Sequence, residues 1–222
     1  MIQGIVIEPA ISSPFDGSMS DVIPKIPSAD GEPAWEAAYL LPPQGRWSEE
    51  DFLKFHTNQM AELVDGRLEI LPMPNLKHQY IVLFLVDAIR RVISNGTGGK
   101  VLFAPLPTRL FPGTIREPDL LYMAPENVPG PEVDYPSKID LAIEIVSRGA
   151  QAHQRDYHDK RRDYAKAGVS EYWIVDPEAK SITVLVLDGE TYRDHGCFTA
   201  GQVASGELLA GFRVDVDQVM NA

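Results

Sequence analysis

The chain has 222 residues, 44% of them hydrophobic and 23% charged, which is typical of a soluble globular protein with one α/β domain and some extensions. Its net charge of -12 argues against binding to nucleic acid through an overall positive charge. No apolar stretch approaches the roughly 18 residues of a membrane span, and one cysteine excludes an internal disulfide, so we expect a cytoplasmic protein without a membrane partner.

The first part of the chain differs in composition from the rest. Residues 1–46 are rich in Pro, Ser, Asp and Gly and lack sustained hydrophobic periodicity, which predicts a partly ordered arm. Residues 47–222 then form the domain. Ser48-Glu49-Glu50-Asp51 matches a capping box with acids in the first turn, so a short helix is predicted to about Gln59.

A hairpin and a long helix are predicted next. Asp65-Gly66 stands between alternating residues over 62–70, which is a strong signal for a two-residue hairpin turn. The broadly apolar segment 77–94 predicts a helix that packs on a sheet, and Asn95-Gly96 ends it.

The second half of the chain alternates strands and a helix. A proline-rich loop covers 124–138, and a helix runs from about His153 to Ala167, where Gly168 stops it. The segment after the last strand is predicted to be a polar hairpin and tail, a C-terminal extension of the domain. The predicted strands are 100–104, 108–111, 119–123, 139–146, 171–176 and 181–187.

Two acids stand in otherwise apolar strands. Asp119 follows Pro118 at the start of one strand, and Glu144 lies in the middle of another. A buried carboxylate is costly unless a cation or metal compensates it. Hard divalent cations such as Mg²⁺ bind carboxylate oxygens and keep several waters, so these two acids on adjacent strands predict a metal site.

The helix after these strands adds a lysine. Tyr157, Lys160 and Tyr164 have the spacing of one helical face, so Lys160 points toward the sheet if the tyrosines pack inward. Its ammonium could orient or help deprotonate an attacking water and stabilise charge on phosphorus, while the metal would polarise the phosphoryl oxygen. The pattern favours hydrolysis of phosphodiester bonds.

Each of these residues also has a structural alternative. Asp119 could simply accept hydrogen bonds from backbone amides, Glu144 could form a buried ion pair with Lys160 without metal, and Lys160 could be a surface residue packed on Tyr164. A local group of cations could either steer a polyanion or be a solvated helix face: Arg148, Arg155, Lys160, Arg161, Arg162 and Lys166.

Taken together, a series of motifs resembles the Uma-type family of putative restriction endonucleases, which belongs to the PD-(D/E)XK nuclease superfamily. The resemblance implies a restriction-endonuclease-like core, an α/β fold with a central mixed β-sheet flanked by helices, and Mg²⁺ or Mn²⁺ as cofactor. It covers roughly residues 47–176, through Glu62-Leu63-Val64-Asp65-Gly66, His78, Arg116-Glu117-Pro118-Asp119, Asp140–Ser147, Lys160 and Gly168–Asp176.

The family motifs assign roles to particular positions. Asp119 matches the Asp of the PD motif, and Glu144 matches the acid of the second motif. Val146 stands where most superfamily members have the catalytic lysine. In the Uma-type group that lysine lies on the following helix, where Lys160 is the matching position.

The resemblance also implies further site residues. Glu62 matches an additional acid on an early element, although Glu69 is a nearby competitor, and His78 matches a histidine at the start of the long helix. His78, Arg155 and Arg161 are candidate substrate contacts.

The function predicted from the sequence is a metal-dependent endonuclease that cleaves DNA, with Asp119 and Glu144 holding Mg²⁺ and with Lys160 and Glu62 contributing. A homodimer would suit cleavage of both strands. Two alternatives stay open: a catalytically weak nucleic-acid-binding or assembly module with the same fold, and a hydrolase of small phosphate esters, which would better tolerate an acidic surface.

Overall fold

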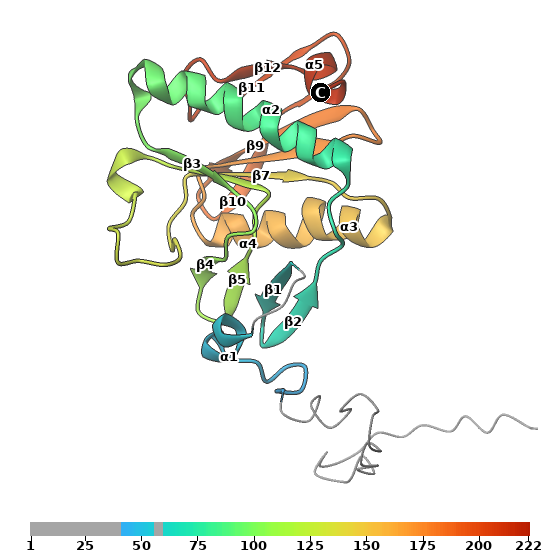
Figure 1. The fold of residues 1–222 in the computed structure, drawn as a ribbon. Helices are drawn as coiled ribbons and strands as arrows, with labels where there is room; N and C mark the ends of the chain where they lie inside the picture. The colour runs from blue at the N-terminus through green and yellow to red at the C-terminus, as the bar shows by residue number, and fades with distance from the viewer. Residues whose placement is uncertain (1–40, 56–59) are drawn as a thin grey trace, which may run out of the picture. The chain divides into compact units, whose positions relative to one another are not determined.

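A six-stranded mixed sheet forms the centre of the fold (Figure 1). Its strand order is β10-β9-β8-β7-β6-β3, with β7 and β8 parallel and every other neighbouring pair antiparallel. The predicted α/β class with a mixed central sheet is confirmed. The strands are β3 (Lys100–Phe103), β6 (Leu120–Met123), β7 (Leu141–Ile145), β8 (Glu171–Asp176), β9 (Ser181–Asp188) and β10 (Thr191–Phe198).

The computed structural model describes residues 41–55 and 60–222. The predicted arm over residues 1–46 therefore lies almost wholly outside the described residues. Residues 43–222 form one compact unit, which contains every helix and strand of the described part. Within the described residues, none of the helices combines the length and apolar character that crossing a membrane requires.

Helices cover both faces of the central sheet. On one face lie α2 (Leu76–Val92) and α5 (Val216–Met220), and on the other a continuous helix consists of α3 (Ala150–Gln154), a π-helical segment (Arg155–Asp159) and α4 (Lys160–Lys166). Five residues of α2 are buried, and each such side chain contributes about 1.5–3 kcal/mol to folding. The side chains of strand β7 alternate between the two faces of the sheet, as predicted. Its odd-numbered residues face α2, and Ala142 faces α4.

A smaller sheet lies beside the central one, with the strand order β2-β1-β5-β4. The predicted hairpin is confirmed, since Asp65 and Gly66 both have positive φ angles, 48° and 73°. The capping box at Ser48 and Asp51 is confirmed as well. The elements are α1 (Glu49–Lys54), β1 (Ala61–Val64), β2 (Arg67–Ile70), β4 (Thr108–Phe111) and β5 (Thr114–Arg116).

Several element boundaries differ from the prediction. Helix α1 ends at Lys54 because Phe55 has an extended backbone, and residues 56–59 lie outside the described part. Strand β5 was not predicted, since three residues are too short to show a periodic pattern. Helix α3 begins at Ala150, three residues before the predicted start at His153. A π-helical turn over Ile93–Thr97, which was not predicted, follows α2.

The segment after β9 contains antiparallel strand pairs, as predicted, but its last twenty residues do not form a polar tail. They form β11 (Val203–Ser205), β12 (Arg213–Asp215) and α5, and they contribute to the core that also contains α2. The Phe212 ring lies 4.8 Å from the Trp173 ring, centroid to centroid. The apolar residues of this C-terminal segment are sparse in sequence, but all of the following are buried in the cluster that contains α2: Ala204, Leu209, Phe212, Val214, Val216, Val219 and Met220.

Candidate active site

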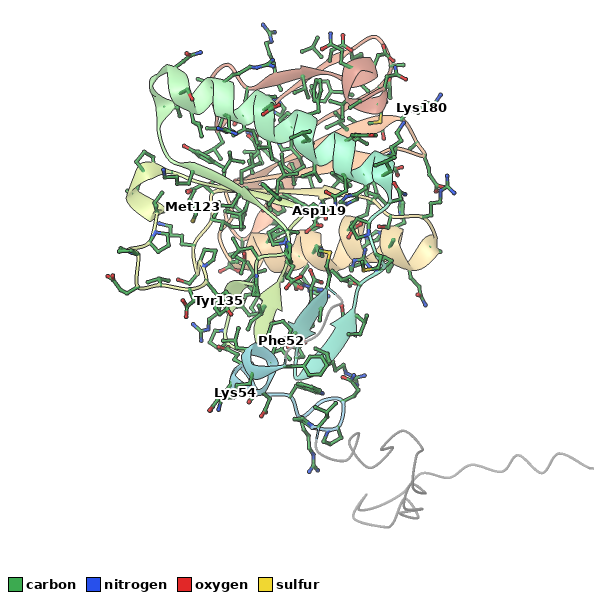
Figure 2. The ribbon with its side chains drawn as sticks, viewed as in Figure 1. Phe52, Lys54, Asp119, Met123, Tyr135 and Lys180 are labelled. Carbon is green, nitrogen blue, oxygen red and sulfur yellow. The ribbon has the colours of Figure 1, made fainter. Side chains whose placement is uncertain are left out.

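Asp119 and Glu144 lie next to each other across two antiparallel strands. Leu120 of β6 pairs with Ile143 of β7, so Asp119 and Glu144 are the next opposed residues. Asp119 Oδ2 accepts a hydrogen bond from the Ile145 amide at 2.7 Å, as the structural alternative anticipated, and also lies 3.0 Å from His78 Nε2. Figure 2 labels Asp119, which lies where α2 and the helix on the opposite face approach the same strand ends.

Lys160 reaches these acids from the first turn of α4. Its side chain is 2% exposed, so the surface alternative is wrong and the predicted inward orientation is confirmed. The Nζ atom lies 2.8 Å from Glu144 Oε1 and 3.0 Å from Glu62 Oε1. Burial lowers the pKa of Lys160, but the carboxylates of Glu144 and Glu62 outweigh burial and raise that pKa above its ordinary value, so the amine is charged.

The π-helical segment Arg155–Asp159 precedes Lys160 directly. A π turn leaves backbone carbonyls without their ordinary helical partners, and the Tyr172 hydroxyl donates to the Asp156 carbonyl at 2.8 Å. The Asp156 side chain is buried and accepts from Arg155 Nε at 3.1 Å. The irregular turn thus presents an acid and a lysine to the sheet from one helix.

Glu62 belongs to a buried ion network centred on Arg116. Glu62 Oε2 accepts from Arg116 Nη1 at 2.7 Å, and its Oε1 accepts from the Glu117 amide at 3.0 Å. Burial raises the pKa of Glu62, but Lys160 and Arg116 outweigh burial and hold that pKa at about 2. Glu69, the sequence competitor, is 42% exposed and contacts the same Arg116 at 3.2 Å, so Glu62 is the acid that positions Lys160.

A cavity of about 20 Å³ lies between the strand ends and the helix, which is room for one water or one ion. Its charged lining residues are Glu117, Asp119, Glu144, Arg155, Asp156 and Lys160. Glu117 Oε2 is buried and has no hydrogen-bond partner among the described residues. Burial, reinforced by the charge of Glu62, raises the pKa of Glu117 to about 7. Burial raises the pKa of Glu144 to about 8, against the lowering effect of Lys160.

These observations fit a divalent cation. Four carboxylates line the cavity, burial raises the pKa values of Glu117 and Glu144, and one oxygen of Glu117 lacks a partner among the described residues. Within the part of the chain that the structure describes, no three His, Cys, Asp or Glu side chains converge closely enough to hold a metal by themselves. Two carboxylates with solvent completing the coordination is the usual arrangement for Mg²⁺.

The three candidate substrate contacts lie in different places. His78 and Arg155 line the cavity with the acids. Arg161 does not line it, because its guanidinium donates to the Tyr192 carbonyl at 3.1 Å and to Asp194 at 2.9 Å. The cationic group predicted along the helix is therefore divided, with Arg155 at the cavity and Arg161 directed toward β10.

Three site residues were missed at the sequence level. Glu117 is the acid just before the Pro118-Asp119 pair, and the density of acids there was a usable signal. Asp156 precedes Lys160 by four residues, the spacing of one helical face. Tyr164, expected to pack inward, also donates its hydroxyl to Glu144 Oε1 at 2.6 Å.

Comparison with known proteins identifies relatives of this arrangement. A model of the Uma2 family, described as "Putative restriction endonuclease", matches residues 49–217. Among solved structures the chain is similar to a "putative nuclease belonging to DUF820" from Anabaena variabilis ATCC 29413, with a TM-score of 0.66 at 18% identity over 78% of this chain and 97% of that chain. No curated protein matches. The structural match confirms the expected restriction-endonuclease-like fold.

Proposed function

The chain belongs to the Uma2 family of putative restriction endonucleases, and from this premise we propose that it is a metal-dependent endonuclease that hydrolyses DNA phosphodiester bonds. One observation carries the proposal: Asp119, Glu144 and Lys160, from two strands and a helix, line a single small buried cavity. Carboxylates and a lysine that converge in this way are suited to phosphoryl chemistry.

Asp119 and Glu144 are the residues that would hold Mg²⁺ or Mn²⁺. The ion would supply Lewis-acid stabilisation of the phosphoryl group. Asp119 is oriented by the Ile145 amide and by His78, and Glu144 is oriented by Lys160 and Tyr164. Both carboxylates are therefore fixed before any ligand arrives, which limits the reorganisation that binding requires.

Lys160 is suited to stabilising negative charge that develops on phosphorus. Its ammonium is charged and buried, so its field is weakly screened by solvent. Glu62 contacts Lys160 and Arg116 but does not line the cavity, which supports a positioning role for Glu62.

The proposal is tested by incubating the purified full-length protein with supercoiled plasmid and with single-stranded DNA, in Mg²⁺ or Mn²⁺. Asp119→Ala, Glu144→Ala and Lys160→Ala are each expected to reduce cleavage by at least about a hundredfold. A matched control is Asp194→Ala, an exposed acid of β10 that pairs with Arg161, which should cleave like wild type.

The outcomes also separate the alternatives. Equal activity in wild type and all three cavity variants would overturn the site assignment. Metal and DNA binding without cleavage would favour the binding or assembly module. Hydrolysis of small phosphate esters in preference to DNA would favour the small-ester hydrolase.

A further inference from the structure

A cleft of about 650 Å³ opens beside the catalytic cavity. Its walls are the loop and first turn at the start of α2, the segment that follows β7, and the turn that follows β8. The cleft shares His78, Ile145 and Ser147 with the cavity, so a chain lying in the cleft reaches the acids. The carboxyl ends of parallel strands, here β7 and β8, are a common place for ligands.

The walls of the cleft combine apolar side chains with few cations. Met73 is 69% exposed and Leu76 is 67% exposed, which is unusual for large apolar residues without a partner. Arg148 has a side chain that is 86% exposed and lies 3.5 Å from Glu178. Lys77, the other cation among the described lining residues, donates its ammonium to the Met220 carbonyl.

This composition matches an unpaired strand better than a duplex. Affinity for the phosphates of duplex DNA depends on how many of them lysine and arginine neutralise, and this cleft offers only two such cations among its described lining residues, on a chain of net charge -12. The bases of an unpaired strand expose apolar faces that side chains can cover. A volume of about 650 Å³ suits a ligand of a few nucleotides at most.

We propose that this cleft selects an unpaired DNA strand, with bases against Met73 and Leu76 and a phosphate at Arg148, so that the scissile bond lies over the Asp119 cavity. The inference rests on the proposed endonuclease function and names its substrate class. Single-stranded segments, flaps or frayed ends are then the substrates, and intact duplex is disfavoured.

The test measures binding separately from cleavage. Fluorescence anisotropy with the full-length Asp119→Asn protein compares a labelled strand of about 15 nucleotides with the blunt duplex of the same sequence. The single strand is expected to bind at least about tenfold more tightly, since covering roughly 55 Å² of apolar surface on its bases corresponds to about tenfold in affinity. Equal binding of the two probes, or tighter binding of the duplex, overturns the proposal.

Variants locate the strand on the surface. Leu76→Asp, Met73→Asp and Arg148→Glu, each in the Asp119→Asn background, are expected to weaken single-strand binding by about tenfold, because each variant places a negative charge where the strand lies. The matched control is Leu83→Asp, which changes another exposed leucine of α2 that does not line the cleft and should bind like its parent. An equal loss in Leu76→Asp and Leu83→Asp would indicate a general charge effect and overturn the assignment.

Failure of this inference differs from failure of the proposed function. If wild type cleaves duplex faster than single strand and binds it more tightly, the endonuclease stands and the cleft proposal fails. If no DNA is cleaved in either metal but the single strand binds through Leu76 and Arg148, the cleft proposal stands and the endonuclease fails.

Discussion

Two clusters of buried charge lie on either side of Lys160, and they differ in how completely their atoms are paired. In the structural cluster, Arg116 bonds Glu62 and Asp163 at 2.7 Å each. In the cavity cluster, formed by Glu117, Asp119, Glu144 and Asp156, one carboxylate oxygen has no partner among the described residues, and the pKa values of three acids are raised.

Burial of a charge therefore does not by itself mark a functional site. Both clusters interrupt apolar surroundings, and both are costly to bury. The structural cluster offsets that cost with charge-assisted hydrogen bonds, whereas in the cavity cluster burial raises the pKa values of Glu117, Glu144 and Asp156. Incomplete pairing of buried acids is the property that distinguishes the candidate site from the structural cluster.

The largest expected effect is on the structural cluster. Arg116→Met removes the cation and leaves Glu62 and Asp163 buried without it, so the free energy of unfolding should fall by about 3–5 kcal/mol in urea denaturation. Arg109→Met is the matched control, since Arg109 is half exposed and bonds Glu49 at the surface, and it should cost no more than about 1 kcal/mol. Similar losses in both variants would contradict the assigned difference.

Metal should act on the cavity cluster alone. Mg²⁺ or Mn²⁺ at a hundredfold excess over its Kd should raise the free energy of unfolding by about 2.7 kcal/mol, because the ion binds the folded state. Thermal unfolding of wild type and of Asp119→Asn measures this effect. If the metal stabilises Asp119→Asn as much as wild type, the cavity cluster is not where the metal binds.

The hydroxyl of Tyr164 offers a smaller test. Tyr164→Phe removes a donor 2.6 Å from Glu144 and should lower the free energy of unfolding by about 2 kcal/mol and also slow cleavage. Tyr192→Phe removes a hydrogen bond of similar length to the Val169 carbonyl. Because Tyr192 does not line the cavity, this change should cost about 1 kcal/mol with cleavage unchanged. A normal cleavage rate for Tyr164→Phe would remove that hydroxyl from the site.

The smallest effect concerns pH. The folded-state pKa of Glu117 is raised from 4.5 to about 7, so its contribution to stability is full below pH 4.5 and is lost as pH rises through 7. Metal-free Glu117→Gln should therefore match wild type near pH 4 and be more stable by about 1 kcal/mol near pH 8, after allowance for solvent screening. Stability curves that stay parallel across this range would show that Glu117 is not held in an unfavourable environment.

Local sequence features were sufficient for much of the fold. The Asp65-Gly66 turn, the Ser48 capping box and the alternation in β7 depend on neighbouring residues, and each is observed. Strand β5 and the C-terminal segment were missed for a shared reason. Ile115 of β5 is buried in a cluster with Phe52 and Leu63, and the apolar residues of the C-terminal segment are buried in the cluster that contains α2. These contacts join residues that are remote in sequence, so no local periodicity predicts them.

The residues of the candidate site also fall into those that local sequence predicted and those that it missed. Asp119 and Glu144 were predictable because an acid in an apolar strand conflicts with its local pattern, and Lys160 was predictable from its helical face. Glu117 lies two residues before Asp119, and Asp156 lies four residues before Lys160, but both stand among other charged residues, so these weak local signals do not separate them from solvated acids. Glu117 and Asp156 are buried because β5, the π-helical segment and the loop before α2 pack around the cavity that they line.

The sequence alone therefore determined where the long helices and most strands of the central sheet form and which acids those strands bear, because side-chain periodicity is a property of neighbours along the chain. Only the tertiary structure decided which carboxylates are neutralised. Glu62 meets Arg116 and Lys160, whereas Glu117 keeps a buried oxygen without a partner among the described residues. Burial and ion pairing depend on distances in space between residues that are remote in sequence, and the fold alone sets those distances.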